Sequence, residues 1–563
     1  MHDTLAVALG AVLVVVALVS QTRRAGDLIK DIPGPPSPSW IFGNLLEIIL
    51  ELPYGVLEFE WQKTFGAVYR TKGCFGENRL MVSDPTTLKH ILSHPGTYMK
   101  SPQQQLINET GLGAGSLLFV EGDAHRRIRG VMNPAFSAAS IRALSPTLKK
   151  AAREARFVSE MWEARLDAQG TDDVLDIYQS LHDTTLQAVG EGVVGYNFQA
   201  DKEFAQRYHN LVLIAADRSK QSILTDGILP YIPKSVLKIL MRFPPPALVK
   251  LLEFKSAIGA LAKALVKEKI DALELGIEPE KDLISVLVGS NSQSVSKMTL
   301  DEIRDQFPTI TVAGEDTTAN TVAWCLYELA KDPEYQHKLR EEVDQAGTDD
   351  SVDYDRLPIL NALIKEVLRL YSTVPQTERV CVKDSVLPLA QPITNTAGKV
   401  ISEIPVRKGQ HIVLAISSYH RLTSVWGDDA AEFKPSRWLG EKAPAAGYSI
   451  GPYSNLWIFF SSISPMLIQT QTVVPRWEPD VYRLALLVSC FAVACRPVSP
   501  AATLTPPRSL AEMQIIISEL VRKFAFALPA EGAGIQPTFA ITLVPMAGDG
   551  SGAKLPLRVT RLH

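Results

Sequence analysis

The chain has 563 residues, of which 46% are hydrophobic and 21% charged, a composition typical of a globular protein with a large core. Its formal net charge is -4, so the composition gives no support to nucleic-acid binding. Five cysteines stand at irregular positions. An odd and irregular set argues against a disulfide-bonded secreted domain and favours a reducing compartment.

The N-terminus carries an apolar run from Leu5 to Ser20, at the short end of the roughly 17–25 residues that span a bilayer. Asp3 precedes the run and Arg23 follows it. By the positive-inside rule this charge pattern predicts a membrane anchor over residues 1–24, with the rest of the chain on the cytosolic side. A cleaved signal peptide is the alternative, but signal peptides carry their positive charge before the apolar run.

The body of the chain begins after a proline-rich hinge over residues 25–40, which we expect to be stiff and extended because proline fixes φ. Short β-like segments lie between about 50 and 110 and between about 380 and 420. The long interval from 137 to 380 is mostly helical, with apolar residues three and four apart. We predict a mainly α fold with a small β-rich part, in a single domain over residues 41–563.

The first motif that carries chemistry is His125-x-x-x-Arg129. Two residues four apart share one helical face, so both side chains can donate to one carboxylate of a bound ligand. A solvated basic helix start is the alternative interpretation.

The second motif is Ala313-Gly314-Glu315-Asp316-Thr317-Thr318, inside a long apolar helical pattern. Glycine in a helix interior costs about 1 kcal/mol relative to alanine, and the close approach of a flat ligand is one reason to keep it. An acid and a hydroxyl beside that gap can relay protons. Alternatively, Asp-Thr-Thr caps a helix at a break near Pro308.

Two further motifs supply charged residues that can pair. Glu366 and Arg369 are three apart on a predicted helix, Leu360–Tyr371, and can form an ion pair. In Pro435-Ser436-Arg437-Trp438, Arg437 can reach back to that pair and complete a charge triad. An ordinary surface pair and a loop arginine are the alternatives.

The order and spacing of these features resemble the cytochrome P450 family, the haem-thiolate monooxygenases, over almost the whole chain. The resemblance implies a cytochrome P450-like fold behind an N-terminal transmembrane helix, with haem b as cofactor. It implies the following roles: His125, Arg129 and Arg379 contact the haem propionates, Asp316 and Thr317 form the acid–alcohol pair for O2 activation, and Glu366, Arg369 and Arg437 form the structural triad behind the haem.

The chain lacks the family's iron-binding signature, Phe-x-x-Gly-x-Arg-x-Cys-x-Gly, which belongs between Trp438 and the last long helix. Cys490 and Cys495 lie in that interval without the flanking glycine and arginine. A thiolate ligand pushes electron density onto the iron and favours O–O cleavage. No residue of the chain as it stands is therefore assigned as a metal ligand.

A one-base shift of the reading frame restores the signature. Codons for Val474–Leu486 can encode Phe-Leu-Gly-Gly-Ser-Arg-Thr-Cys-Ile-Gly-Trp-Arg-Phe in the next frame, with the cysteine near Val481. Codons at Val473 and at Val488-Ser489 also permit splice-site-like sequences. We interpret residues 458–509 as retained-intron or frame-shifted sequence. A real insertion in a degenerate family member is the alternative.

For the intact gene product, the resemblance implies monooxygenation of a lipophilic organic substrate, a secondary metabolite or xenobiotic, with O2 and electrons from an NADPH–cytochrome reductase. It implies a single-pass protein of the endoplasmic reticulum membrane with a cytosolic catalytic domain. If the thiolate is truly missing, the alternative is a catalytically dead pseudoenzyme or a membrane-anchored binding protein.

Overall fold

The structure is a computed structural model. It describes residues 27–133, 158–198, 201–208, 219–232, 246–277, 282–347, 352–440, 508–530 and 534–562, apart from positions 169, 171, 202, 295, 296 and 541. The predicted anchor over residues 1–24 and the interval 458–507 lie outside the described residues.

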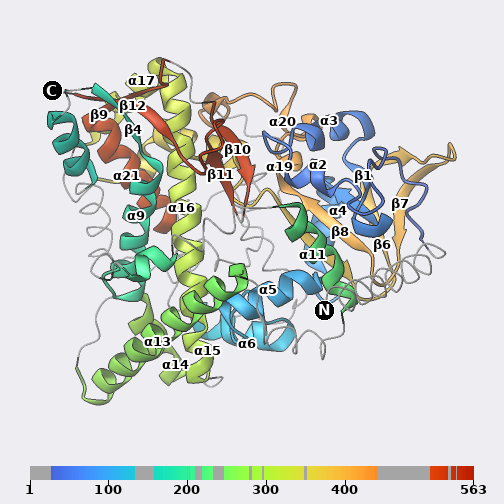
Figure 1. The fold of residues 1–563 in the computed structure, drawn as a ribbon, viewed down its shortest axis with the longest axis horizontal. Coiled ribbons are helices and arrows are strands. Elements are labelled where there is room, and N and C mark those ends of the chain that lie inside the picture. Colours follow the sequence, from blue (N-terminus) through green and yellow to red (C-terminus); the bar gives the residue numbers. More distant parts are fainter. Residues whose placement is uncertain are drawn as a thin grey trace, which may run out of the picture.

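A long central helix, α16 (Gln306–Lys331), organises the helical body. Figure 1 shows α9 and α21 beside it and α13, α14 and α15 gathered around one of its ends. The described helices are α2 (Leu45–Ile49), α3 (Val56–Phe65), α4 (Pro85–Ser93), α5 (Pro102–Leu112), α6 (Gly122–Met132), α9 (Tyr178–Val189), α11 (Lys220–Ile228), α13 (Pro246–Glu274), α14 (Leu283–Gln293), α15 (Leu300–Arg304), α16, α17 (Pro333–Ala346), α18 (Pro358–Leu370), α19 (Ile416–Tyr419), α20 (Thr423–Trp426) and α21 (Arg508–Lys523). Short 3-10 or π turns are η1 (Cys74–Gly76), η3 (Gly190–Val194), η4 (Leu229–Tyr231), η5 (Tyr354–Arg356) and η6 (Pro435–Trp438).

The start of α16 explains why its motif lies inside a helix. A capping box between Thr299 and Glu302 begins the short helix α15, and α16 follows after Asp305. Pro308 occupies the first turn of α16, where its missing N–H has no helical acceptor to lose. The helix then runs unbroken to Lys331, so the alternative of a capping Asp-Thr-Thr at a helix break is wrong.

The β-rich part stands beside the helical body, at the right of Figure 1. Its main sheet has the strand order β1-β2-β8-β5-β3, with β2 and β8 parallel and the other neighbours antiparallel. Smaller sheets have the orders β10-β11 and β6-β7, and a further sheet, β4-β12-β9, lies against the helical body, at the upper left of Figure 1. The strands are β1 (Val68–Lys72), β2 (Asn78–Val82), β3 (Tyr98–Lys100), β4 (Asp172–Asp176), β5 (Gln376–Cys381), β6 (Ser385–Thr394), β7 (Val400–Val406), β8 (His411–Ala415), β9 (Phe524–Ala527), β10 (Gln536–Phe539), β11 (Leu543–Met546) and β12 (Pro556–Arg561).

The mainly α architecture with a smaller β-rich part is thus the predicted one. Strand β4 is an element that the sequence pattern did not indicate. Its sequence, Asp-Asp-Val-Leu-Asp, lacks the alternation of a half-buried strand. The strand forms because it pairs with β12 at the far end of the chain, with Leu175 opposite Leu557, and such a long-range partner leaves no local signal.

The described part of the proline-rich hinge packs against the domain and does not stand away from it. The backbone N–H of Arg70 donates to the carbonyl of Pro33 at 2.8 Å. A Cβ atom on Gly34 would lie 1.8 Å from the carbonyl oxygen of Arg70, so only glycine allows this close approach to β1. Within the described ranges, no helix has both the length and the apolar character needed to cross a bilayer.

Candidate active site

The central helix presents a row of buried threonines around its glycine. The Thr317 hydroxyl donates to the carbonyl of Ala313 at 2.8 Å, and the Thr318 hydroxyl donates to that of Gly314 at 2.7 Å. Such bonds to the carbonyl four residues earlier satisfy a hydroxyl inside a helix. The Thr317 oxygen keeps its accepting capacity, which a proton relay requires.

Asp316 is a buried acid held by two uncharged partners. Its Oδ2 accepts from Thr542 Oγ1 at 2.6 Å, and its Oδ1 accepts from Asn320 Nδ2 at 3.1 Å. Burial, helped by the neighbouring Glu315 carboxylate, raises the pKa of Asp316 to about 6. An acid with this pKa can both hold and release a proton near neutral pH.

The raised pKa of Asp316 predicts a pH-dependent stability. An unfolded aspartate has its usual pKa of 3.8, whereas the folded one is near 6, so the folded chain holds an extra proton between these values. Stability from this site is therefore lost as pH rises from about 4 to about 7, by on the order of 3 kcal/mol. The variant Asp316→Asn should lack this loss. Urea unfolding at pH 4.5 and 7 measures it, and parallel profiles for both proteins would refute the assignment.

The residues predicted to contact haem propionates lie on different elements, and their charges act on one another. His125 and Arg129 lie on α6 and Arg379 on β5. Burial, together with Arg129 and Lys100, lowers the pKa of His125 to about 4. Burial and nearby Arg379 lower the pKa of Lys100 to about 8. These residues therefore form a basic cluster in which Arg129, Lys100 and Arg379 each lower the pKa of a neighbour.

Arg379 is the most informative member of the basic cluster. Its side chain is buried, and burial lowers the pKa of its guanidinium to about 10, against the opposing effect of Glu121. It donates to Thr377 Oγ1 at 3.1 Å and to the carbonyl of Glu378 at 2.7 Å. No carboxylate in the described part of the chain forms an ion pair with it. A buried arginine of this kind fits an anionic ligand.

The predicted charge triad forms a buried network. Arg369 and Glu366, both fully buried, form a bidentate pair with contacts of 2.8 and 2.9 Å. Arg437 Nε donates to Glu366 Oε1 at 3.0 Å. Trp438 Nε1 adds a fourth contact, to Glu366 Oε2 at 2.9 Å. The structure therefore brings the three charged residues of two distant motifs into direct contact.

The three cysteines in the described ranges, Cys74, Cys325 and Cys381, are buried and free of disulfides. Burial raises the pKa of the Cys74 thiol to about 11 and that of Cys381 to about 12, and it raises the pKa of Cys325 strongly as well. Groups of this kind are structural cysteines rather than reactive thiolates. Cys490, Cys495 and position 481 lie outside the described residues.

Several site residues were not predicted from the sequence. Lys100 joins the basic cluster because β3 pairs with β5 and sets it opposite Arg379. Thr542 reaches Asp316 from the turn between β10 and β11. Neither position stands in a motif, so only the fold could reveal them. Glu315 did leave a signal, since a second acid beside Asp316 inside an apolar helix needs a buried partner.

Comparison with known proteins agrees with this architecture. The cytochrome P450 family profile matches residues 33–455. Cytochrome P450 monooxygenase 205 of Postia placenta is 30% identical over the whole chain and 98% of its own length. Cytochrome P450 monooxygenase 91 of the same fungus is 32% identical over 73% of this chain and 78% of its own. Cytochrome P450 monooxygenase claO of Ampulloclitocybe clavipes is 26% identical over 97% and 96%.

The chain belongs to the cytochrome P450 family. Members of this family are haem-thiolate monooxygenases that oxygenate small organic molecules, so haem is the expected cofactor. The basic cluster and the buried Arg379 fit the carboxylate end of a haem. Among the described residues, none is assigned as a ligand of the haem iron.

Proposed function

We propose that the intact gene product is a membrane-bound, haem-dependent monooxygenase that oxidises a lipophilic organic substrate with O2 and electrons from an NADPH–cytochrome reductase. The observation that carries the proposal is the buried Arg379, which has no carboxylate partner in the described chain and lies among other bases. When bound, haem would supply the O2-activating chemistry. His125, Arg129, Arg379 and also Lys100 would hold its propionates, and Asp316 and Thr317 would hold and pass protons.

Replacing Arg379 tests the haem-binding part of this proposal. The variant Arg379→Gln should retain haem roughly ten- to a hundredfold less tightly, because a charge-assisted hydrogen bond contributes about 1.5–3 kcal/mol. Haem transfer to an excess of apomyoglobin measures the change. Arg356→Gln is the matched control, since that side chain is 85% exposed, and it should transfer haem at the wild-type rate. Equal rates for all three proteins would contradict the assignment.

We propose that residues 458–509 are noncoding or frame-shifted sequence that replaces the cysteine loop. Two observations support this besides the hidden signature at Val481. The family match ends at residue 455, and the helix that follows the interval, α21, packs on α16, α17 and α18. Sequencing the transcript across codons 457–510 should yield a Cys-containing loop. A sole transcript that keeps every residue would instead favour the pseudoenzyme or binding protein, for which the missing signature is the supporting observation.

We propose that residues 1–24 anchor the protein in the endoplasmic reticulum membrane, with the catalytic domain in the cytosol. The described residues that follow include exposed apolar side chains, Trp40 (44% exposed), Ile41 (42%) and Leu52 (44%). Large exposed apolar side chains near an anchor favour contact with a membrane surface. The full-length protein should stay in the membrane fraction after an alkaline wash. After deletion of residues 1–24, an alkaline or high-salt wash without detergent should release the protein from the membranes. Unchanged retention would contradict an anchor in this segment.

A further inference from the structure

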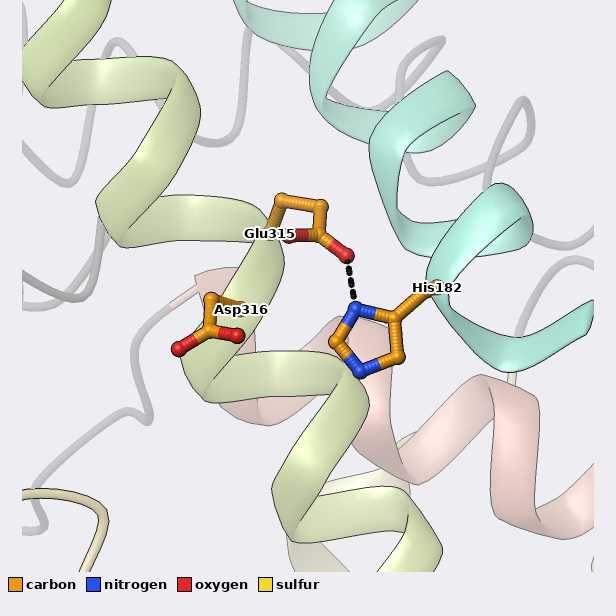
Figure 2. A group of neighbouring side chains, drawn as sticks. All are labelled: His182, Glu315 and Asp316. Carbon is orange, nitrogen blue, oxygen red and sulfur yellow. Dashed lines mark hydrogen bonds and ion pairs between the residues drawn. The ribbon is translucent and has the colours of Figure 1, made fainter. Parts of the chain in front are cut away.

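A second titratable cluster lies on the side of α16 that faces α9. Figure 2 shows His182 from α9 directed at Glu315, with Asp316 next to it on α16. His182 Nδ1 lies 2.6 Å from Glu315 Oε1. One ring nitrogen of His182 and one carboxylate oxygen each of Glu315 and Asp316 lie within 4.8 Å of one another, and all three residues are buried. Three titratable groups this close must share their protons.

The carboxylates of this cluster are fully occupied by hydrogen-bond donors. Glu315 Oε1 accepts from His182 and lies 3.3 Å from Thr185 Oγ1, and Glu315 Oε2 accepts from the Tyr208 hydroxyl. Both oxygens of Asp316 are also bonded, as described above. A metal ion would have to displace these donors, so the arrangement favours a proton-holding network over a metal site.

The imidazole of His182 is the cationic group of this network. Among the described residues, no lysine or arginine forms an ion pair with Glu315 or Asp316. Burial lowers the pKa of His182, but Glu315 and then Asp316 and Asp183 outweigh burial and raise it above its usual range. His182 is therefore the group of this network that can carry a positive charge, and it faces two consecutive carboxylates.

The two tyrosines packed against the network are neutral, whereas Asp183 next to His182 is an exposed acid. Burial, and then the same two carboxylates, raise the pKa of the Tyr178 hydroxyl on α9 and that of Tyr208 well above their usual range. Two carboxylates thus share one positive charge in a buried setting. Because a net buried charge is costly, Asp316 holds its proton to a higher pH than an exposed aspartate does.

We propose that His182 is a positioning residue for Asp316: its imidazolium is a countercharge shared by two consecutive carboxylates, and it sets the pH at which Asp316 releases its proton. This inference rests on the proposed function only in that Asp316 is taken to hold and pass protons in the reaction. The shared countercharge is a property of the fold itself.

Two substitutions of residues that lie close to Asp316 should shift its titration midpoint in opposite directions. In His182→Gln the lost positive charge raises the titration midpoint of Asp316, and in Glu315→Gln the lost negative charge lowers it. Each shift should be at least roughly one pH unit, because charges about 5 Å apart interact by several kcal/mol even at an effective dielectric constant of about 20. The readout is the ¹³C resonance of labelled aspartate carboxyls in the full-length, detergent-solubilised protein, with Asp316→Asn to assign the signal.

Tyr208→Phe is the matched control, because it removes a hydrogen bond to Glu315 without changing any charge. It should leave the Asp316 midpoint near the wild-type value. Shifts in the same direction in both charge variants, or no shift in either, would overturn the proposal. If one charge variant fails to fold, the other still gives a signed result.

The same experiment separates this inference from the proposed function, because it needs neither haem nor turnover. If the Asp316 midpoint shifts in opposite directions in the two variants of a protein that shows no monooxygenation, the role of His182 as countercharge is supported and the proposed function is refuted. In a protein that does turn over, the acid limb of the pH–rate profile should move in the same direction as the Asp316 midpoint.

Discussion

Arg369→Ala is expected to prevent stable folding of the domain. The guanidinium is fully buried, forms a bidentate pair with Glu366, and donates to the backbone carbonyls of His420, Ala430 and Glu432. Removing one partner of a buried ion pair typically costs about 3–5 kcal/mol, because the remaining charge is left without compensation. This loss is a large fraction of the stability of a typical domain. The measurements are soluble yield and the midpoint of urea unfolding.

A surface ion pair provides the control for that experiment. Lys338 pairs with Glu334 on α17, and the two side chains are 57% and 80% exposed. The variant Lys338→Ala should unfold at the wild-type urea concentration, because exposed pairs contribute little. If Arg369→Ala unfolds at the same midpoint as this control, the triad does not stabilise the fold.

Thr317→Val is expected to lower product formation by the intact enzyme roughly a hundredfold, at the low end of what a positioned proton-transfer group contributes. The substitution keeps the shape of the side chain and removes the hydroxyl beside Asp316. The measurement is the amount of product formed per NADPH consumed. It requires protein translated from the transcript that carries the cysteine loop.

Thr318→Val is a closely matched control, because both hydroxyls are buried and both donate to the carbonyl four residues earlier, at 2.8 and 2.7 Å. Any cost of losing that helical bond is therefore common to the two variants. Thr318→Val should form nearly as much product per NADPH consumed as the wild type. Equal losses in the two variants would mean that Thr317 has only a structural part.

The helical elements could be predicted from local pattern. The stretch Leu360–Tyr371 corresponds to α18 (Pro358–Leu370), whose apolar face is regular enough to indicate a helix. The motifs could also be predicted, because each is a short segment in a fixed order along the chain. The contact of Arg437 with Glu366 was predicted from the opposite charges of two motifs, and the resemblance added its role as a structural triad.

Contacts between distant segments could not be predicted in the same way. His182 meets Glu315 because α9 packs along α16, and nothing in the sequence around His182 indicates this neighbour. Lys100 and Thr542 reach the site through strand pairing and a hairpin turn. The buried partners of an acid depend on tertiary packing, so the sequence predicts that partners exist but not which residues they are.

We propose above all that the gene encodes a haem-thiolate enzyme. Its iron-binding cysteine would be encoded near Val481, in the reading frame shifted by one base. The most direct test is the carbon-monoxide difference spectrum of the reduced protein, expressed from the native transcript. We predict the strongly red-shifted Soret band of a thiolate-ligated carbonyl complex, and its loss when the cysteine of the restored loop is replaced by serine. A protein that binds no haem, or whose carbonyl complex shows the unshifted band of a nitrogen ligand, would contradict the claim.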